Sequence, residues 1–273
     1  MTKNKHFQSC LAFVASAVAT FSYALPNASK MQIEWQSIEG CAKEISIIEY
    51  GKPLVVGCAS ASKMGNQLFR RLDSSWVLQE GAGVKIADLG STVSPLIIDK
   101  FYNVWRGANA KQADCAVEIA ASSRPDIWAV GCRGGFIQRA NNLKPVVVAN
   151  KVTSEYDIDT WKTIGGGRKA AKIAVGDAVW IIDKESNIFT YDSANTAWIQ
   201  KVGCAKDIAA NLNHVWVIGC ASGGAGGNEI FKWTGTDWQK VKGAAVKIAV
   251  DSLGNPWVID NSNQIWTWTF KKP

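Results

Sequence analysis

Two stretches, WIQKVGCAKDIAANLNHVWVIGC (198–220) and WQKVKGAAVKIAVDSLGNPWVIDNSNQIWTW (238–268), carry one pattern and decide the fold. Each opens with a tryptophan, continues to an Ile-Ala pair and reaches a short apolar run that contains a second tryptophan. Related copies recur six times along the chain, with a period of roughly 35–50 residues. Repeats of this length that hold several short β-rich runs are typical of propellers. The sequence therefore predicts an all-β fold, a six-bladed β-propeller.

The six copies alternate between two types. Their second strands read LVVGC, PLIIDK, WAVGC, WIIDK, WVIGC and WVIDN, so Gly-Cys in odd repeats alternates with Asp-Lys or Asp-Asn in even ones. The residue before each anchoring isoleucine alternates in charge as well, through Glu44, Lys85, Glu118, Lys172, Asp207 and Lys247. An alternation with period two over six copies predicts pseudo-three-fold symmetry built from pairs of blades.

The spacing of the cysteines predicts how they pair. Cys41 lies four residues before Ile45, and Cys58 lies four residues after Leu54. If Ile45 faces Leu54 on two antiparallel strands, Cys41 faces Cys58 within disulfide reach. The other repeats supply the anchor pairs Ile119–Trp128, Ile208–Trp216 and, without cysteine, Ile86–Leu96, Ile173–Trp180 and Ile248–Trp257. We therefore predict three disulfides, Cys41–Cys58, Cys115–Cys132 and Cys204–Cys220.

The two ends of the repeat region complement each other. Residues 32–38 read as a fourth strand of a repeat, and residues 264–270 read as a third strand. Their pairing would complete the last blade and close the ring, which removes exposed sheet edges. An open solenoid is the alternative. Residues 25–273 are accordingly predicted to form a single propeller domain.

Residues 1–24 have the composition of a signal peptide. Lys3 and Lys5 precede an apolar run from Leu11 to Phe21, and Ser22-Tyr23-Ala24 offers small residues for cleavage. The apolar run is too short for a membrane anchor, and no membrane span is expected. A signal peptide together with fully paired cysteines predicts a secreted or periplasmic protein.

The charge of the chain is mildly basic and dispersed. The formal net charge is +7, and loss of Lys3 and Lys5 with the signal peptide lowers it to +5. No run of lysine and arginine tracks a phosphate backbone, so a nucleic-acid partner is not expected.

The repeat, written W-x-x-[IV]-x-G-x-A-x-x-I-A followed by V-W-x-[IV]-[DG] and N-x-I-[FW], resembles the tectonin repeat over residues 32–270. The resemblance implies a six-bladed propeller lectin of the tachylectin-1, fish-egg-lectin or fungal-tectonin type. Its members bind N-acetylglucosamine, lipopolysaccharide or O-methylated glycans, and others act in protein interaction. Where the family often has Val-Asn after the second-strand tryptophan, this chain has Ile-Asp or a Gly-Cys ending. That departure points to three sites rather than six.

The sequence offers little for catalysis. Outside the signal peptide the only histidine is His214, and every remaining cysteine has a predicted partner, which leaves no nucleophile–base set. The cysteine spacings do not match zinc sites, and the glycine runs at 165–167 and 223–227 lack a phosphate-loop context. Three-fold symmetry would hold the repeated aspartates too far apart for glycoside hydrolysis. We therefore expect no enzyme, no metal and no cofactor.

Even repeats combine polar groups at the end of the second strand with an aromatic residue on the third. A sugar site needs an aromatic face for its C–H surface and fixed polar groups for its hydroxyls. The predicted sites are Asp99, Lys100 and Trp105; Asp183, Lys184 and Phe189; and Asp260, Asn261 and Trp266. In the alternative, these aromatics pack between blades and each aspartate pairs with a lysine of its own repeat, Lys85, Lys172 or Lys247. The second-strand tryptophans, Trp128, Trp180, Trp216 and Trp257, are predicted to pack between blades.

The sequence thus favours a secreted lectin that binds cell-surface glycans or lipopolysaccharide through several sites, without catalysis. The alternative is a secreted protein-interaction scaffold. Its contact element would be the longer stretch from Asn141 to Thr160, which we predict to be a protruding loop.

Overall fold

The computed structural model describes residues 32–90, 93–108, 110–122, 126–148 and 151–271. These residues form 21 β-strands and, within the described ranges, no helix, so the all-β prediction is confirmed. Accordingly, no helix suited to crossing a membrane is found in them. The predicted signal peptide, residues 1–24, lies outside the described residues.

The strands form three seven-stranded antiparallel sheets. One sheet has the order β19 (Lys247–Val250), β20 (Pro256–Ile259), β21 (Gln264–Lys271), β1 (Gln32–Ser46), β2 (Leu54–Ser62), β3 (Gly65–Leu72) and β4 (Ser75–Gly83). The next has β11 (Lys151–Thr163), β10 (Ile137–Val148), β9 (Ile127–Gly131), β8 (Ala110–Ala121), β7 (Asn103–Arg106), β6 (Leu96–Ile98) and β5 (Lys85–Ala87). The third has β12 (Lys172–Val175), β13 (Val179–Ile182), β14 (Asn187–Asp192), β15 (Ala197–Asn211), β16 (His214–Gly224), β17 (Gly227–Trp233) and β18 (Trp238–Ala245).

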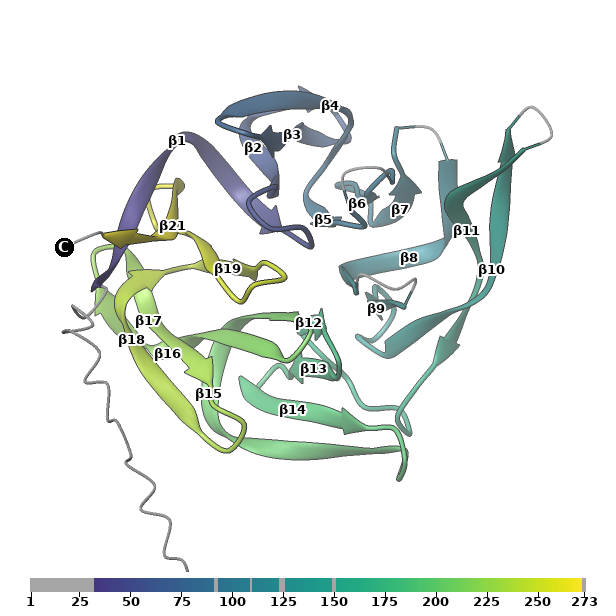
Figure 1. The fold of residues 1–273 in the computed structure, drawn as a ribbon. Helices are drawn as coiled ribbons and strands as arrows, with labels where there is room; N and C mark the ends of the chain where they lie inside the picture. Colours follow the sequence, from purple (N-terminus) through teal and green to yellow (C-terminus); the bar gives the residue numbers. More distant parts are fainter. Residues whose placement is uncertain (1–31, 91–92, 109, 123–125, 149–150, 272–273) are drawn as a thin grey trace, which may run out of the picture.

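Each sheet joins two sequence repeats through one long strand. The first part of β1, from Gln32 to Cys41, pairs with β21, whereas Ala42 to Ser46 pair with β2. Strands β8 and β15 divide between two neighbours in the same way. The inner strands β1, β5, β8, β12, β15 and β19 each contact the next in turn, and β19 contacts β1. Figure 1 shows them facing a common centre.

The three predicted disulfides are confirmed, with Cα–Cα distances of 5.6 Å in every pair. The predicted anchor register is wrong by one residue, because Ile45 faces Val55 and not Leu54. The register shifts between Ala42 and Glu44, and this shift brings Cys41 back opposite Cys58. The same one-residue correction holds in the other repeats: Ile119–Ala129, Ile208–Val217, Ile86–Ile97, Ile173–Ile181 and Ile248–Val258.

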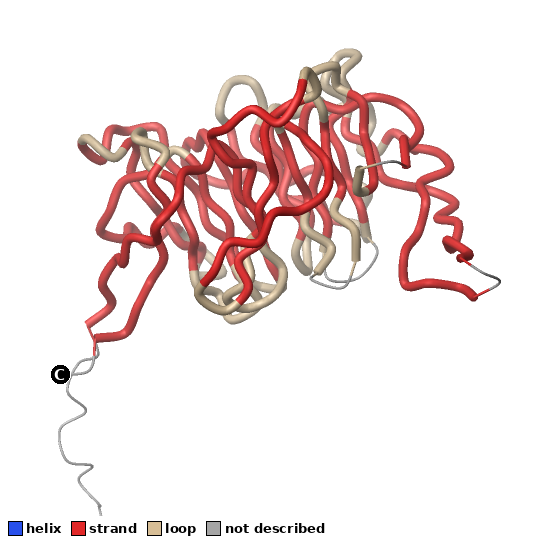
Figure 2. Tube along the Cα trace, turned by 90° about the horizontal axis from the view of Figure 1, so that it is seen from above, coloured by secondary structure: helices blue, strands red, loops and turns tan. Residues whose placement is uncertain are grey.

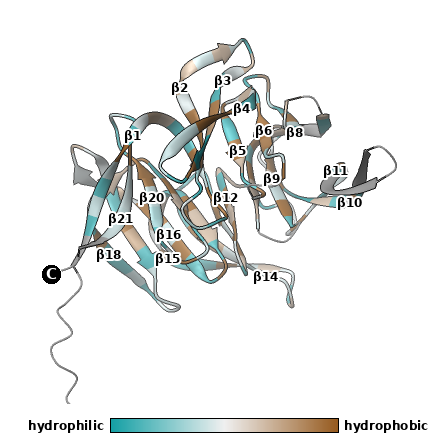
Figure 3. Ribbon diagram, turned by 45° about the horizontal axis from the view of Figure 1, so that its top comes forward, coloured by the Kyte–Doolittle hydropathy of each residue, from teal (hydrophilic) through white to brown (hydrophobic). Residues whose placement is uncertain are grey.

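The core lies between neighbouring repeats. All four second-strand tryptophans are buried, as predicted, and Trp216 has no exposed surface. Aromatic rings from the next repeat meet three of them edge-on, for example Trp233 against Trp180 at 5.5 Å between ring centroids. Figure 3 colours β6 and β9 as apolar, in agreement with their complete burial.

The stretch from Asn141 to Thr160 is not the predicted loop. Its residues continue β10 and β11 as a paired hairpin, with Asn141 opposite Thr160 and Val148 opposite Lys151. Figures 1 and 2 show this hairpin extending beyond the rest of the sheets. Its outer part can protrude because the backbone groups of the two strands pair with each other. Its base is held by β8, because Ile158 N–H donates to Gln112 Oε1 at 2.7 Å.

Candidate ligand sites

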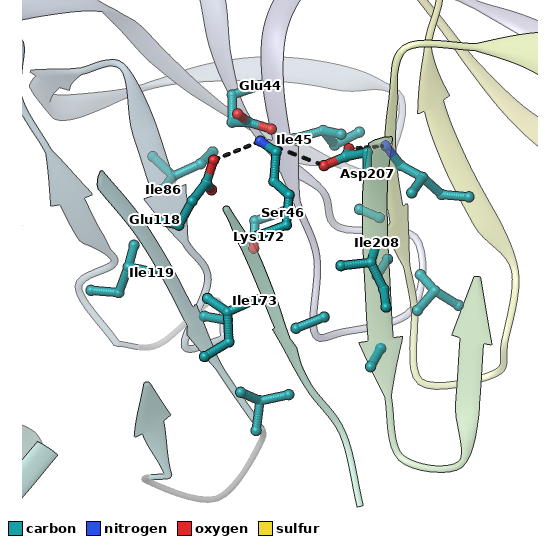
Figure 4. Close-up of a pocket in the computed structure, with 18 of the residues that line it drawn as sticks. Glu44, Ile45, Ser46, Ile86, Glu118, Ile119, Lys172, Ile173, Asp207 and Ile208 are labelled. Atoms are coloured by element: carbon teal, nitrogen blue, oxygen red, sulfur yellow. Dashed lines mark hydrogen bonds and ion pairs between the residues drawn. The ribbon is translucent and has the colours of Figure 1, made fainter. Parts of the chain in front are cut away.

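Six charged side chains meet at the centre of the inner strands. We call this set the axial charge ring: Glu44, Lys85, Glu118, Lys172, Asp207 and Lys247. Lys85 Nζ lies 2.5 Å from a Glu44 oxygen and 2.8 Å from a Glu118 oxygen. Lys172 lies between Glu118 at 2.6 Å and Asp207 at 3.7 Å, as Figure 4 shows, and Lys247 lies 3.1 Å from Glu44. The alternation visible in the sequence is therefore a series of ion pairs around the axis, which runs from Lys247 through Glu44 to Asp207. The charges of Asp207 and Lys247 also attract each other, although no ion pair within 4 Å joins these two described residues.

The ring has perturbed ionisation. Burial would raise the pKa of Glu44, but the charges of Lys85, Lys247 and Lys172 outweigh it and lower that pKa to about 2. At Asp207 burial wins, and the pKa is raised despite the opposing charges of Lys247 and Lys172. Burial would lower the pKa of Lys85 and Lys247, but their acidic neighbours raise both.

The cavity inside the axial charge ring is about 80 Å³. Small-molecule sites usually measure about 300–1,000 Å³, so this cavity is too small for a sugar. The ring therefore holds the inner strands together and does not provide a glycan site.

Asp99 organises the turn between β6 and β7. Its Oδ1 accepts hydrogen bonds from the backbone N–H groups of Phe101 at 2.8 Å and Asn103 at 3.0 Å. Its Oδ2 accepts from Asn103 Nδ2 and from Trp105 Nε1, both at 2.9 Å. Burial would raise the pKa of Asp99, but the hydrogen bonds from Asn103 and Trp105 outweigh it and lower that pKa.

The other even repeats build the same turn. Asp260 accepts from Gln264 N at 3.0 Å and from Trp266 Nε1 at 2.9 Å. Asp183 accepts from Asn187 N at 2.8 Å, but Phe189 offers no N–H in place of the indole. The predicted ion pairs of these aspartates with lysines are wrong. Lys85, Lys172 and Lys247 begin the inner strands and point to the axis, where the acids of the odd repeats bind them.

The structure places the predicted site residues in three different settings. Trp105 is half-buried and lines a pocket of about 250 Å³ together with Met64. Trp266 is also half-buried and packs against the cluster that contains Trp216. Phe189 is buried, and the guanidinium of Arg168 lies 4.0 Å from its ring centroid.

The polar partners in those sites are exposed. The Lys100, Lys184 and Asn261 side chains face solvent. The Lys100 N–H donates to Met64 C=O at 2.8 Å, and the Asn261 N–H donates to Gly226 C=O at 3.0 Å. Two of the three even turns are thus fixed against the preceding odd repeat. Their role in binding stays a prediction.

Two larger grooves flank β17 and were not predicted. The first, about 710 Å³, is lined by Trp35, Trp268, Lys232 and Gln239 among others. The second, about 560 Å³, shares Lys232 and Gln239 and adds Trp180, Trp233 and His214. The sequence signal for the first groove was Trp35, which opens a fourth strand. However, Lys232 and Gln239 come from another repeat, and Trp268 lies at the far end of the chain, so only the fold brings them to Trp35.

The described residues contain no group of three or more His, Cys, Asp or Glu side chains suited to a metal ion. His214, the histidine considered above, lies in the second groove beside Gly254.

Solved structures with the same architecture show the fold class. The chain resembles the β-propeller domain of Cps50 (Swd1) from Myceliophteria thermophila, with a TM-score of 0.56 and 9% identity over 88% of this chain and 100% of that one. It also resembles YCF48 bound to D1 peptide (TM-score 0.51, 11% identity, 88% and 97% covered) and a streptogramin B lyase (0.51, 12%, 88% and 98%).

These likenesses define the chain as a β-propeller. No family model and no curated protein matches its sequence. At such low identity the likeness concerns the fold alone, and the solved structures include both a lyase and a peptide complex. Propeller folds host unrelated functions, so function has to be argued from the sites of this chain.

Proposed function

We propose that this chain is a secreted or periplasmic lectin, a closed six-bladed propeller of tectonin type that binds glycans without catalysis. The closed ring is supported by the pairing of β1 with β21 and by the cycle of contacts among the inner strands. Secretion is supported by the three disulfides, because such bonds persist in oxidising compartments.

The groove lined by Trp35 and Trp268 carries the proposal. Its volume of about 710 Å³ suits one or two sugar rings. The Trp35 indole is fixed by a hydrogen bond from Nε1 to Lys242 C=O at 2.5 Å and meets Trp268 edge-on, with centroids 5.9 Å apart. Both indoles are half-buried and so keep exposed apolar surface. Lys232 and Gln239 on the same wall supply donors and an acceptor for hydroxyl groups.

Partners of this kind are glycans or lipopolysaccharide on a cell surface. Single grooves of this shape bind weakly, and several sites on one ring raise the effective concentration when the ligand is multivalent. The pocket at Trp105 and the half-buried Trp266 are candidates for further sites.

A glycan array that includes acetylated sugars, methylated sugars and lipopolysaccharide tests the proposal, with titration calorimetry on the strongest ligand. Lys232→Gln should weaken binding about tenfold, because it removes a charged donor from the groove wall. Lys201→Gln is the matched control. Lys201 Nζ lies 5.7 Å from the Trp233 ring much as Lys232 Nζ lies 5.6 Å from Trp216, but Lys201 does not line the groove. The proposal is contradicted if no glycan on the array binds, or if both variants weaken glycan binding equally.

The sites predicted from the sequence have their own test. Trp105→Ala and Trp266→Ala should each reduce the number of sugars bound per chain if these indoles contact sugar. Folded variants with unchanged stoichiometry would assign binding to the groove alone. Variants that fail to fold would assign Trp105 and Trp266 to packing.

A second function, protein interaction, is favoured by the protruding hairpin of β10 and β11. Replacing residues 145–156 with a two-residue Asn-Gly turn shortens it without touching the grooves, and keeps Asp157 with its partners Arg106 and Gln112. If the hairpin is a contact element, the shortened chain should lose a captured protein partner and keep its sugar binding.

A further inference from the structure

One even repeat differs from the other two where the chain enters its inner strand. A single residue, Val84 or Val246, separates the strands β4 and β5 and the strands β18 and β19. The matching connection from β11 to β12 runs from 164 to 171, with the sequence IGGGRKAA. This longer connection carries Arg168 and Lys169, and we call it the basic connection.

Glycine shapes the basic connection. Gly165, Gly166 and Gly167 have φ values of +77°, +64° and +83°, a region that residues with a side chain rarely adopt. The connection then lies against the turn after β9, because Ala170 N–H donates to Gly135 C=O at 2.9 Å and Phe136 pairs with Lys169. That turn carries Arg133, so two basic segments lie side by side.

Two cations of this surface, Arg168 and Lys169, contact aromatic rings and not carboxylates. The Arg168 guanidinium lies 4.0 Å from the Phe189 centroid, and Lys169 Nζ lies 5.4 Å from that of Phe136. Across the described residues, no ion pair joins a carboxylate to Arg133, Arg168 or Lys169. Other arginines are paired, since Arg70 binds Asp88 and Arg139 binds Asp126.

The stacking on Phe189 has two consequences. It covers the aromatic face that would serve a sugar ring in the equivalent pocket at Trp105. It also holds the Arg168 guanidinium at the ring, and the donors of a guanidinium suit the oxygens of a sulfate or phosphate better than those of a neutral hydroxyl. The amides of Gly166 and Gly167 lie in the same connection, and within the described residues no hydrogen bond to either is found.

We propose that the basic connection and Arg133 form an anion site for a sulfate or phosphate monoester borne on a glycan. The Arg168 guanidinium would bind two of the anion's oxygens, and Lys169 and Arg133 would neutralise the remaining charge. The proposal rests on the proposed function for the sugar that carries the anion, but not for recognition of the anion itself.

Titration calorimetry with N-acetylglucosamine 6-sulfate, the 6-phosphate and unmodified N-acetylglucosamine tests this site and separates the two esters. At least one ester should bind about tenfold more tightly than the unmodified sugar, and Arg168→Gln/Lys169→Gln should remove that advantage. Arg133→Gln/Lys169→Gln keeps Arg168 on the Phe189 ring and should weaken ester binding several-fold. This second variant tests the site even if the first variant fails to fold.

Lys43→Gln/Lys206→Gln is the control, because it removes the same charge from two exposed lysines of other repeats. Equal losses in the control and test variants would overturn the site in favour of general attraction by net charge. Equal affinity of wild-type protein for esters and unmodified sugar would also overturn it. Failure of the lectin proposal would give a different result. Lys232→Gln would then have no effect on the binding of any sugar, whereas inorganic sulfate would still compete with the ester for the site at Arg168.

Discussion

In odd repeats the end of the second strand is bonded covalently to the start of the inner strand, as Cys58 is to Cys41. In even repeats the same position holds an aspartate that accepts hydrogen bonds from the residues of the next turn, as Asp99 does from Asn103 and Trp105. The two repeat types also contribute opposite charges to the axis, acids from odd repeats and lysines from even ones. Neither repeat type can pair the charges at the axis by itself, so the unit that recurs along the chain is a pair of repeats.

The sharpest way to break this complementarity is to remove a lysine from the axis. Lys85→Met leaves Glu44 and Glu118 without their shared cation and should lower the free energy of unfolding by about 4 kcal/mol. Urea denaturation measures the loss. Lys100→Met, at an exposed lysine of the same repeat, should change stability by less than about 0.5 kcal/mol. A loss as small in Lys85→Met would mean that the ring does not hold the centre.

The two kinds of acid in the ring should respond to pH with opposite signs. The folded pKa of Glu44, about 2, is below its ordinary 4.5, so its contribution is present above pH 4.5 and is lost as pH falls toward 2. Glu44→Gln should therefore cost about 3 kcal/mol at neutral pH and progressively less in acid. Asp207 has a raised pKa, so its contribution is present below pH 3.8 and is lost as pH rises through the folded pKa.

Denaturant unfolding of both variants between pH 7 and pH 3 makes this comparison. Asp207→Asn should lose less stability than Glu44→Gln at neutral pH. Parallel pH profiles for the two variants would contradict the assignment of opposite shifts.

The disulfides of the odd repeats can be removed one at a time. Cys204→Ser/Cys220→Ser opens a bridge between residues 16 apart and should cost about 3 kcal/mol by the chain-entropy model. Thermal and urea unfolding of the double variant measure this loss. Cys41→Ser/Cys58→Ser should cost a similar amount, and strongly unequal losses would show that the odd repeats are not equivalent.

The aspartate turns allow the finest comparison. Asp99→Asn removes an acceptor that Asn103 and the Trp105 indole both use, and should cost about 2 kcal/mol. Asp183→Asn should cost about 1 kcal/mol, because Phe189 makes no equivalent hydrogen bond. Urea unfolding of both variants gives the difference. Equal costs would show that the indole hydrogen bond adds nothing to the turn.

The repeat pattern predicted an all-β propeller and the cysteine partners, yet the register it assumed was wrong by one residue. Strand β2 is buried on both faces from Leu54 to Gly57, so its apolar run shows no alternation that could reveal which residue faces Ile45. The bulge beside Lys43 shifts the pairing by the same single residue, and the disulfides were therefore predicted correctly.

The sites were harder to predict for a different reason. The alternating charges were visible, but which way Lys85 points depends on the register of the inner strand. The groove needs Trp35 and Lys232, which belong to different repeats and meet only when β1 lies beside the far end of the chain. No local pattern in the sequence contains that contact.

The pairing of β1 with β21 also bears on how the molecule is made. Ile38 C=O accepts a hydrogen bond from the side chain of Gln264, 226 residues later, so this seam has a very high contact order. During synthesis, the part of β1 that pairs with β21 would stay unpaired until nearly the whole chain had emerged. The Cys41–Cys58 disulfide joins residues only 17 apart, so it can form early in an oxidising compartment, next to the unpaired part of β1. Early oxidation would then keep the first half of the seam in shape for its distant partner.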